Sequence, residues 1–470
     1  MNENTPLTQP ASPASLSPRI ASLDVLRGMA ILGALFAAIW VFGGFSEQQQ
    51  YTALMKQKGA DRPVYTVMQF LFDGKMLALI SLVFGASMVL FLSKETELGK
   101  QPAGDVFIKR QLWLIVFGIV NAVLFLYPID FLFHLGVVGL LLFPLVRISK
   151  KALLIAALAT TFIYCGKLFW DYSDDKKTYQ KYVAVTRLEK KFEQDSLAKA
   201  KAGLAAKKDT LTKQQKGEKE AWTGLLAGKK IDTKKDDGAI KAMRNESYGK
   251  VWNHVLPQTQ GREASWTYQK GVWDVSAMLF LGMLLYRIGF FNHRFRTQRY
   301  AAIAVVALAG AVLLGWFRFH FLAQTLTDYE KYVKGQLLPA NFFYPIERAA
   351  TALGYASLVM FLLSYRVFGK LLYVFEAVGK LALTNYLAQT LFCTWLFYGY
   401  GLGHYARFGQ YNLYFIAAEI VLVQCVFSVI WLRYYNYGPA EWLLRRLSAG
   451  KWLPASLRKP QTEPIIPALP

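Results

Sequence analysis

The most regular feature of this chain is a series of apolar stretches, separated by shorter polar segments. An α-helix needs about 20 residues to cross the hydrocarbon core of a bilayer, and these stretches have about that length. We therefore predict an all-α fold, a polytopic membrane bundle of about ten transmembrane helices, with nine or eleven as alternatives. The predicted spans are 26–45, 72–93, 109–127, 131–147, 152–170, 272–290, 300–322, 346–365, 379–398 and 412–433.

Residues 171–270 interrupt this pattern because they are charged and rich in Ala, Lys and Glu. They predict one or two exposed helices in a solvated hairpin; the alternative is a cap over a cavity or a surface for acidic envelope components. This insert separates an N-terminal membrane half, 19–170, from a C-terminal half, 271–448. Residues 1–18 and the Pro-rich residues 449–470 are predicted to be disordered tails.

Basic residues in the short loops predict how the helices are oriented. They fall in alternate loops, for example at Lys150 and Lys151 and at Arg294 and Arg296, whereas the turn at 127–130 has none. Short loops rich in Lys and Arg stay in the cytoplasm, while long loops cross the membrane largely regardless of charge. We therefore expect both termini to be cytoplasmic and the insert to be extracytoplasmic.

The composition excludes several classes of protein. The net charge is +23, but no nucleic-acid recognition motif accompanies it, so we expect no nucleic-acid partner. Cys165, Cys393 and Cys425 lie singly in apolar runs and form neither a disulfide framework nor a metal cluster. No phosphate-binding loop, dinucleotide fingerprint or nucleophile elbow is present, so we do not expect ATP-driven transport by this chain alone.

The first apolar run begins with an acid and a base. Asp24 and Arg27 are three residues apart and share a helical face, and Ser22 is placed to cap the helix. One interpretation is an anchor and cap. The other, which the family resemblance given below favours, is a substrate site in which Arg27 binds a phosphate of a nucleotide-like or lipid donor, since its guanidinium binds two oxygens at once.

Asp130 and His134 are the predicted catalytic pair. They are four residues apart at the start of the fourth span, and a carboxylate one turn from an imidazole can orient it as a general base. Arg318, His320 and His404 are expected on the same side of the membrane, as candidate substrate contacts. The alternative for each His is an amphipathic anchor at the interface.

Other polar residues lie in or beside the predicted spans. Asp73 and Lys75 flank Gly74, and they either line a polar cavity or, in the case of Lys75, reach the interface by snorkelling. Asn385 and Glu419 lie within spans, where such groups contact substrate or form interhelical hydrogen bonds. All four are candidate substrate-binding residues.

Several stretches carry a family resemblance. RIASLDVLRGMAILG at the start, FDGKMLALISLVFGASM, FLGMLLYRIGF, VGKLALTNYLAQT and NYGPAEWLLRRL resemble the YeiB-type family of uncharacterised bacterial inner-membrane proteins. The resemblance covers nearly all spans and implies the inner membrane as the location. The first helix is also similar to that of membrane acyltransferases, which implies acyl-CoA as a donor substrate, no bound cofactor, and an envelope polysaccharide or lipid acceptor. The His of the polysaccharide acyltransferases is missing, since Ala38 occupies that region.

Two functions follow as hypotheses. The first is transfer of an acyl group from a cytoplasmic donor to an envelope acceptor, with Arg27 at the donor and Asp130 and His134 at the acceptor. The alternative is a non-enzymatic transporter or channel for a small metabolite or lipid, which the missing His favours. The sequence leaves the oligomeric state and the identity of donor and acceptor open.

Overall fold

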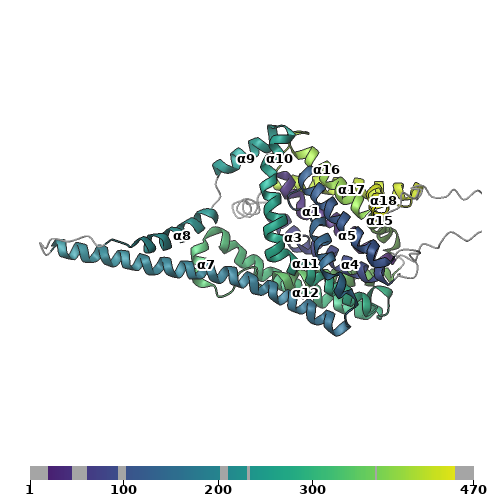
Figure 1. Ribbon diagram of the computed structural model, residues 1–470, viewed down its shortest axis with the longest axis horizontal. Coiled ribbons are helices and arrows are strands. Elements are labelled where there is room, and N and C mark those ends of the chain that lie inside the picture. Colours follow the sequence, from purple (N-terminus) through teal and green to yellow (C-terminus); the bar gives the residue numbers. More distant parts are fainter. Residues whose placement is uncertain are drawn as a thin grey trace, which may run out of the picture.

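The computed structural model describes residues 20–44, 61–93, 102–201, 210–229, 233–365 and 368–449. Every regular element within these ranges is a helix, which confirms the predicted all-α bundle (Figure 1). The predicted tails, 1–18 and 449–470, lie outside the described residues except for Ala449.

Each of the ten predicted spans corresponds to a helix. They are α1 (Ala21–Gly43), α4 (Lys75–Leu92), α5 (Ala103–Ile119), α6 (Leu132–Leu142), α7 (Lys150–Lys201), α11 (Val272–Arg287), α12 (Thr297–Thr327), α14 (Tyr344–Leu363), α16 (Ala382–Phe397) and α17 (Gln410–Tyr434). Among the described residues, seven helices are long and apolar enough to cross a membrane; α6, α11 and α16 are shorter. A total of ten crossings therefore stays a prediction.

Smaller elements complete the described chain. They are α3 (Asp61–Leu71), η1 (Val120–Leu124), η2 (Phe143–Arg147), α8 (Lys213–Lys229), α9 (Thr233–Asn245), α10 (Tyr248–Gln260), η3 (Gly261–Gly271), η4 (Phe290–Asn292), α13 (Tyr329–Gly335), α15 (Gly369–Lys380) and α18 (Pro439–Ala449).

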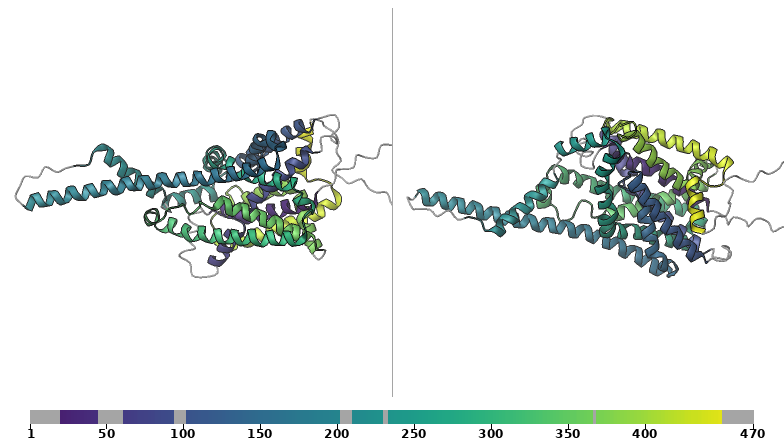
Figure 2. Two further views of the ribbon diagram at one scale, coloured as in Figure 1. Left: turned by 90° about the horizontal axis from the view of Figure 1, so that it is seen from below. Right: turned by 45° about the horizontal axis from the view of Figure 1, so that its top comes forward.

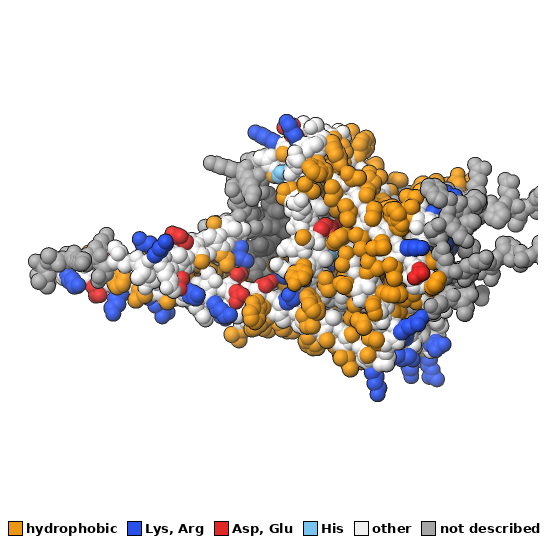
Figure 3. All heavy atoms as spheres, viewed as in Figure 1, with side chains coloured by type: hydrophobic (Ala, Val, Ile, Leu, Met, Phe, Trp, Pro, Cys, Tyr) orange, Lys and Arg blue, Asp and Glu red, His pale blue; other side chains and the backbone are white. Residues whose placement is uncertain are grey.

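The surface of the bundle is apolar, as a bilayer requires. Along α12, for example, the side chains of Val305, Leu313 and Trp316 are each about 70% exposed. Hydrophobic side chains cover the bundle face in Figure 3, while many of the charged ones lie on the projecting insert and at the opposite end. A water-soluble protein rarely exposes so large an apolar area, so we identify the chain as a membrane protein.

Glycines allow the central helices to pack closely. A side chain at Gly28 of α1 would collide with the backbone of α15, and one at Gly379 of α15 with the backbone of α1. Gly85 of α4 and Gly282 of α11 have the same reciprocal relation. Small residues at such crossings are typical of membrane helices, which associate largely through van der Waals packing.

The first part of the insert projects away from the bundle. Helix α7 continues without a break from the predicted fifth span into the insert, and α8 packs back along it (Figures 1 and 2). Trp222 of α8 is fully buried between Tyr179 and Tyr182 of α7 and Tyr329 of α13. This aromatic cluster fixes the base of the hairpin.

The last part of the insert is packed on the bundle. Helix α10 leads into η3, a π-helix, which continues directly into α11. The Tyr248 hydroxyl donates to the carbonyl oxygen of Leu124, and the Arg244 guanidinium donates to those of Tyr405 and Ala406. Residues 244–271 therefore form part of the bundle at the end from which the hairpin projects, hereafter the insert end.

Candidate functional site

A buried group of unpaired polar side chains lies at the insert end, where η3 packs on the start of α6. His134 of α6 is fully buried, and Arg262 and Glu263 of η3 lie beside it. The His134 Nδ1 and a Glu263 carboxylate oxygen are 4.0 Å apart. Both ring nitrogens of His134, both carboxylate oxygens of Glu263 and the Arg262 Nε form no hydrogen bond to another side chain in the described part of the protein. Such groups are costly to bury unpaired, so this arrangement points to a ligand or water among them.

Trp266 packs against both His134 and Arg262. The ring of Trp266 lies edge-on to that of His134, with 5.1 Å between the ring centroids. The Arg262 guanidinium carbon lies over the Trp266 ring, 3.7 Å from its centroid. Arg262 and Trp266 are four residues apart, and the wide turn of a π-helix places them on one face. π-helical segments are rare and frequently mark functional sites.

Asp130 does not pair with His134. Its carboxylate accepts hydrogen bonds from the Asn121 side-chain amide (2.7 Å), the Phe133 backbone N–H (3.0 Å) and the Tyr386 hydroxyl (3.1 Å). Asp130 lies before the first helical residue of α6, so the spacing of an i,i+4 pair within a helix does not apply to it. It caps the helix start instead, and the carboxylate nearest to His134 is that of Glu263.

A buried ion-pair network adjoins this group. Glu347 of α14 accepts from Lys75 of α4 (2.8 Å) and from Arg318 of α12 (2.8 Å), and Arg348 pairs with Asp274 of α11. Asp73 lies 3.9 Å from Arg318. The structure thus joins the predicted residues Asp73, Lys75 and Arg318.

Lys75 does not reach the interface by snorkelling. Its side chain is fully buried, and its ammonium donates to the backbone oxygen of Gln69 as well as to Glu347. Arg348 also donates to the backbone oxygen of Gly74, whose φ of 66° places it in the left-handed region. The turn at Gly74 therefore directs the Gly74 carbonyl oxygen at the buried guanidinium of Arg348.

The two groups form one polar region, because Arg262 lies within electrostatic range of both Asp274 and Arg348. We call this region the insert-end cluster. Its members are Asp73, Lys75, Asp130, His134, Arg262, Glu263, Asp274, Arg318, Glu347 and Arg348. Asp73 and Asp130 lie in the segments just before α4 and α6, and the other members lie on α4, α6, α11, α12, α14 and the π-helix η3.

Asp24 and Arg27 pair with each other at the opposite end of the bundle. One amino group of Arg27 lies 2.6 Å from Asp24, and the other donates to the Ser87 hydroxyl at 2.8 Å. Ser22 does not cap α1; its hydroxyl donates to the backbone oxygen of Phe291. The Arg27 side chain remains 31% exposed, so it is accessible as well as paired.

Asn385 was predicted either to contact substrate or to form interhelical hydrogen bonds, and the structure shows the hydrogen bonds. Its amide donates to the Ser428 hydroxyl of α17 at 2.9 Å, and its backbone oxygen accepts from Gln424 at 2.9 Å. Gln389 in turn donates to Gln424. These hydrogen bonds join α16 to α17.

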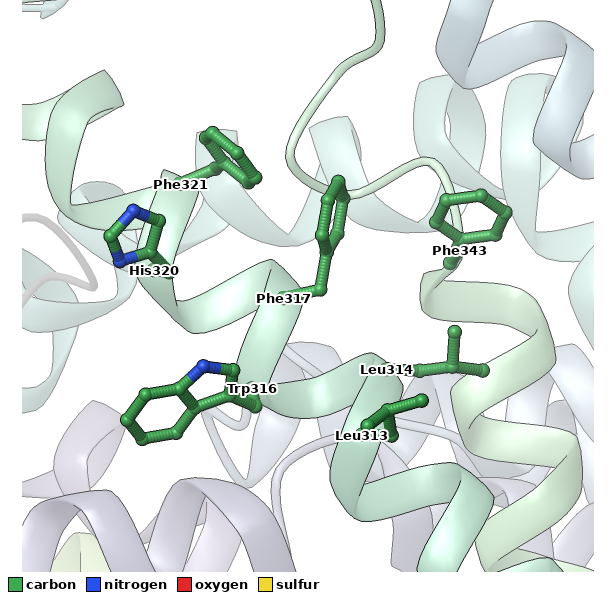
Figure 4. A pocket seen from close by; sticks show the side chains of 7 residues that line it. All are labelled: Leu313, Leu314, Trp316, Phe317, His320, Phe321 and Phe343. Carbon is green, nitrogen blue, oxygen red and sulfur yellow. The ribbon is translucent and has the colours of Figure 1, made fainter.

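Three predicted residues stand apart from the insert-end cluster. His320 lies on a groove of about 340 Å³ with apolar side chains of α12 and Phe343 (Figure 4). His404 is half-buried in the loop before α17, and Glu419 is exposed on α17. Within the described residues, none of the three forms a hydrogen bond or ion pair with the cluster, and no group of three potential metal ligands occurs.

Arg262, Glu263, Trp266 and Asp274 were missed by the sequence reasoning. The stretch GREASW does carry a signal, since a charged pair and an aromatic residue lie a few positions before an apolar run. Its place at the end of a highly charged insert concealed that signal, because charge in the insert predicts solvent exposure.

Glu263 gives the site a measurable pH dependence. Burial raises its pKa from the ordinary 4.5 to about 8, with a smaller contribution from the nearby Asp130 charge. The folded protein therefore keeps this proton up to about pH 8, whereas the unfolded chain loses it near pH 4.5, so the free energy of unfolding falls as the pH rises between these values. We expect Glu263→Gln to remove this part of the decline, on the order of a few kcal/mol.

Thermal unfolding in detergent at pH 5, 7 and 9 measures the effect. The informative quantity is the difference between wild type and variant, since other groups also titrate in this range. Parallel pH dependences of the two proteins would show that Glu263 ionises normally in the fold.

The chain is similar to one described family and to bacterial relatives. Residues 285–451 match the family described as "Protein of unknown function (DUF418)". The chain is 28% identical to "Uncharacterized protein YeiB" of Escherichia coli over 448 residues, which cover 92% of this chain and 96% of YeiB. It is 27% identical to "Uncharacterized protein YxaH" of Bacillus subtilis, covering 94% of this chain and 97% of YxaH. No solved structure matches.

These matches confirm the resemblance to the YeiB-type family. The similarity of the first helix to acyltransferases stays a prediction. The DUF418 region contains Arg318, Glu347 and Arg348, whereas His134, Arg262 and Glu263 precede it. The insert-end cluster therefore draws on both membrane halves.

Proposed function

We propose that this membrane protein, which is similar to YeiB and whose residues 285–451 match the DUF418 family, transfers an acyl group to a hydroxyl or amine of an envelope acceptor at the insert end. The observation that supports this most is His134, which is buried beside Glu263 and Arg262 and whose two ring nitrogens have no side-chain hydrogen-bond partner. An imidazole in this state can accept a proton, and an arginine beside it can stabilise a developing oxyanion.

The proposed roles follow from the contacts. His134 takes the proton of the acceptor group as that group attacks the acyl carbonyl carbon. Arg262, held against Trp266, stabilises the negative charge that forms on the carbonyl oxygen. The bond from the acyl carbon to the thiol sulfur of the donor breaks, and the His134 imidazolium returns its proton to that sulfur. Glu263 is the positioning residue for His134.

The orientation that the basic loops predict would place this chemistry outside the cell. Both termini and Arg27 then lie on the cytoplasmic side of an inner membrane, and an acyl-CoA donor would meet Arg27 through a phosphate. Between the two ends, a cavity of about 10 Å³ is lined by Ala34, Ala38, Tyr127, Tyr386 and Gln389. It holds about one water molecule, so the helices around it must move before the thioester end of a donor held at Arg27 can reach His134.

Transport is a second candidate function, and the ion-pair network favours it. Lys75, Arg318, Glu347 and Arg348 lie buried at the ends of spanning helices, and ionisable groups in such positions frequently mark pathways for ions or polar substrates. In this case the unpaired groups of the cluster would bind a small polar molecule without changing it.

Reconstitution into sealed vesicles separates the two functions. Acetyl-CoA labelled in the acetyl group is supplied on the face that carries Arg27, and an envelope extract on the other face. Acyl transfer predicts covalent label on an acceptor that protein-free vesicles do not produce. Passage of an intact labelled small molecule without covalent label would favour transport and contradict the proposed transfer.

A further inference from the structure

Glu419 occupies an unusual place on the surface of the bundle. It lies near the middle of α17, and it is the one charged residue of that helix before Arg433. Its side chain is exposed, and it forms no hydrogen bond or ion pair within the described part of the chain. It therefore faces the hydrocarbon core of the membrane rather than the polar interior of the protein.

An ionised carboxylate in this position is unfavourable. Insertion of a charged side chain at the centre of a bilayer costs about 3 kcal/mol on biological scales, and a glutamate is too short to reach the interface from there. A protonated carboxyl avoids the charge but still carries an unpaired donor and an unpaired acceptor. Both problems disappear if another helix covers Glu419 and pairs with it.

The side chains around Glu419 form a helix-packing seam. Phe415, Leu422, Val426 and Ile430 are each half exposed or more. Together with Glu419 they follow the chain at steps of four, three, four and four residues. Steps that mix three and four residues are typical of the seam along which two helices pack nearly parallel.

We propose that this face of α17 binds the same face of a second copy of the chain. Two copies in one membrane with the same orientation are related by a two-fold axis along the membrane normal, so a residue on the seam meets its own counterpart at equal depth. A protonated carboxyl is complementary to itself, because each group donates one hydrogen bond and accepts another. Glu419 would thus pair with Glu419 of the second copy, between apolar contacts on both sides.

A partner helix with a basic side chain at the same depth could also satisfy Glu419. The seam favours the second copy, because that copy brings an apolar stripe of identical spacing and a carboxyl at the matching position. A different protein would need an apolar stripe of the same spacing and, in place of the carboxyl, a basic side chain at the depth of Glu419. Purified protein distinguishes the cases, since only self-association persists without another protein.

The test counts subunits by single-molecule photobleaching of a fluorescent fusion in vesicles at low protein density. We expect the wild type to be dimeric and Glu419→Gln to remain so, because an amide also donates and accepts. Glu419→Leu should weaken the dimer at least about tenfold, although leucine is more apolar than glutamate. Val306→Leu, on the exposed face of α12, is the matched control and should change nothing.

Three results would overturn the proposal. They are a wild type that is monomeric at every density, a dimer that Glu419→Leu leaves intact, and a dimer that Val306→Leu weakens equally. Thermal unfolding of each variant in detergent confirms that the monomer fold is kept. None of these results bears on acyl transfer, so this proposal and the proposed function fail separately.

Discussion

Replacing Arg348 with leucine should lower the free energy of unfolding by about 3–5 kcal/mol, because it leaves a buried charge without its partner. Arg348 and Asp274 pair in the interior at exposures of 5% and 3% of their side chains. Arg348 also satisfies the backbone oxygen of Gly74. The substitution therefore strands a carboxylate and a carbonyl together.

A double-mutant cycle tests whether the pair is responsible. Arg348→Leu with Asp274→Leu removes both charges, and a buried pair replaced by apolar residues of similar volume is frequently close to neutral. We expect the double variant to recover most of the loss in unfolding experiments in mixed micelles. Lys250→Ala breaks an exposed pair with Glu246 and should cost less than about 1 kcal/mol. An Arg348→Leu protein as stable as wild type would contradict the assigned role.

Replacing His134 with alanine should lower the initial rate of acyl transfer by about 10²–10⁴-fold, the usual contribution of a general base. The labelled acetyl-CoA assay in vesicles measures this rate. The loss should appear across the pH range, since alanine cannot accept a proton at any pH. Glutamine at this position tests the same point with less change in volume against Phe133 and Trp266.

His320→Ala is the matched control for this experiment. His320 is also on a membrane helix, but it faces an apolar groove at the surface and has no contact with the insert-end cluster within the described residues (Figure 4). Its loss should leave the rate within about twofold of wild type, in line with the small effect of surface substitutions. A His134→Ala protein that is folded and transfers label at the wild-type rate would remove the base from the mechanism.

The helices were predictable because membrane spans obey a local rule. A stretch of about 20 apolar residues forms a helix in lipid wherever it occurs, since each backbone polar group must be satisfied within the segment. All ten predicted segments are helical for this reason. Residues such as Lys75 and Arg318 could be selected by the same rule, because a charge within such a segment requires a partner or a function.

The residues that these polar side chains contact could not be predicted from local sequence. His134 and Glu263 are separated by 129 positions, and Lys75 and Glu347 by 272. The pair that local spacing suggested, Asp130 with His134, is not formed because a helix begins between the two residues. Residue spacing predicts contacts within one helix, and the insert-end cluster consists largely of contacts between helices.

The sequence alone determined that this is an all-helical membrane protein, because hydropathy and helix length depend on neighbouring residues only. Its resemblance to the YeiB-type family is likewise a property of the sequence, carried by stretches such as RIASLDVLRGMAILG. The tertiary structure decided that the end of a charged insert packs on the bundle as a π-helix and brings Arg262 and Glu263 to His134. It also decided that the Glu419 side chain lies on the outer surface of the bundle. The direction in which a polar side chain points depends on how helices distant in sequence pack together, and that packing is set by the whole chain.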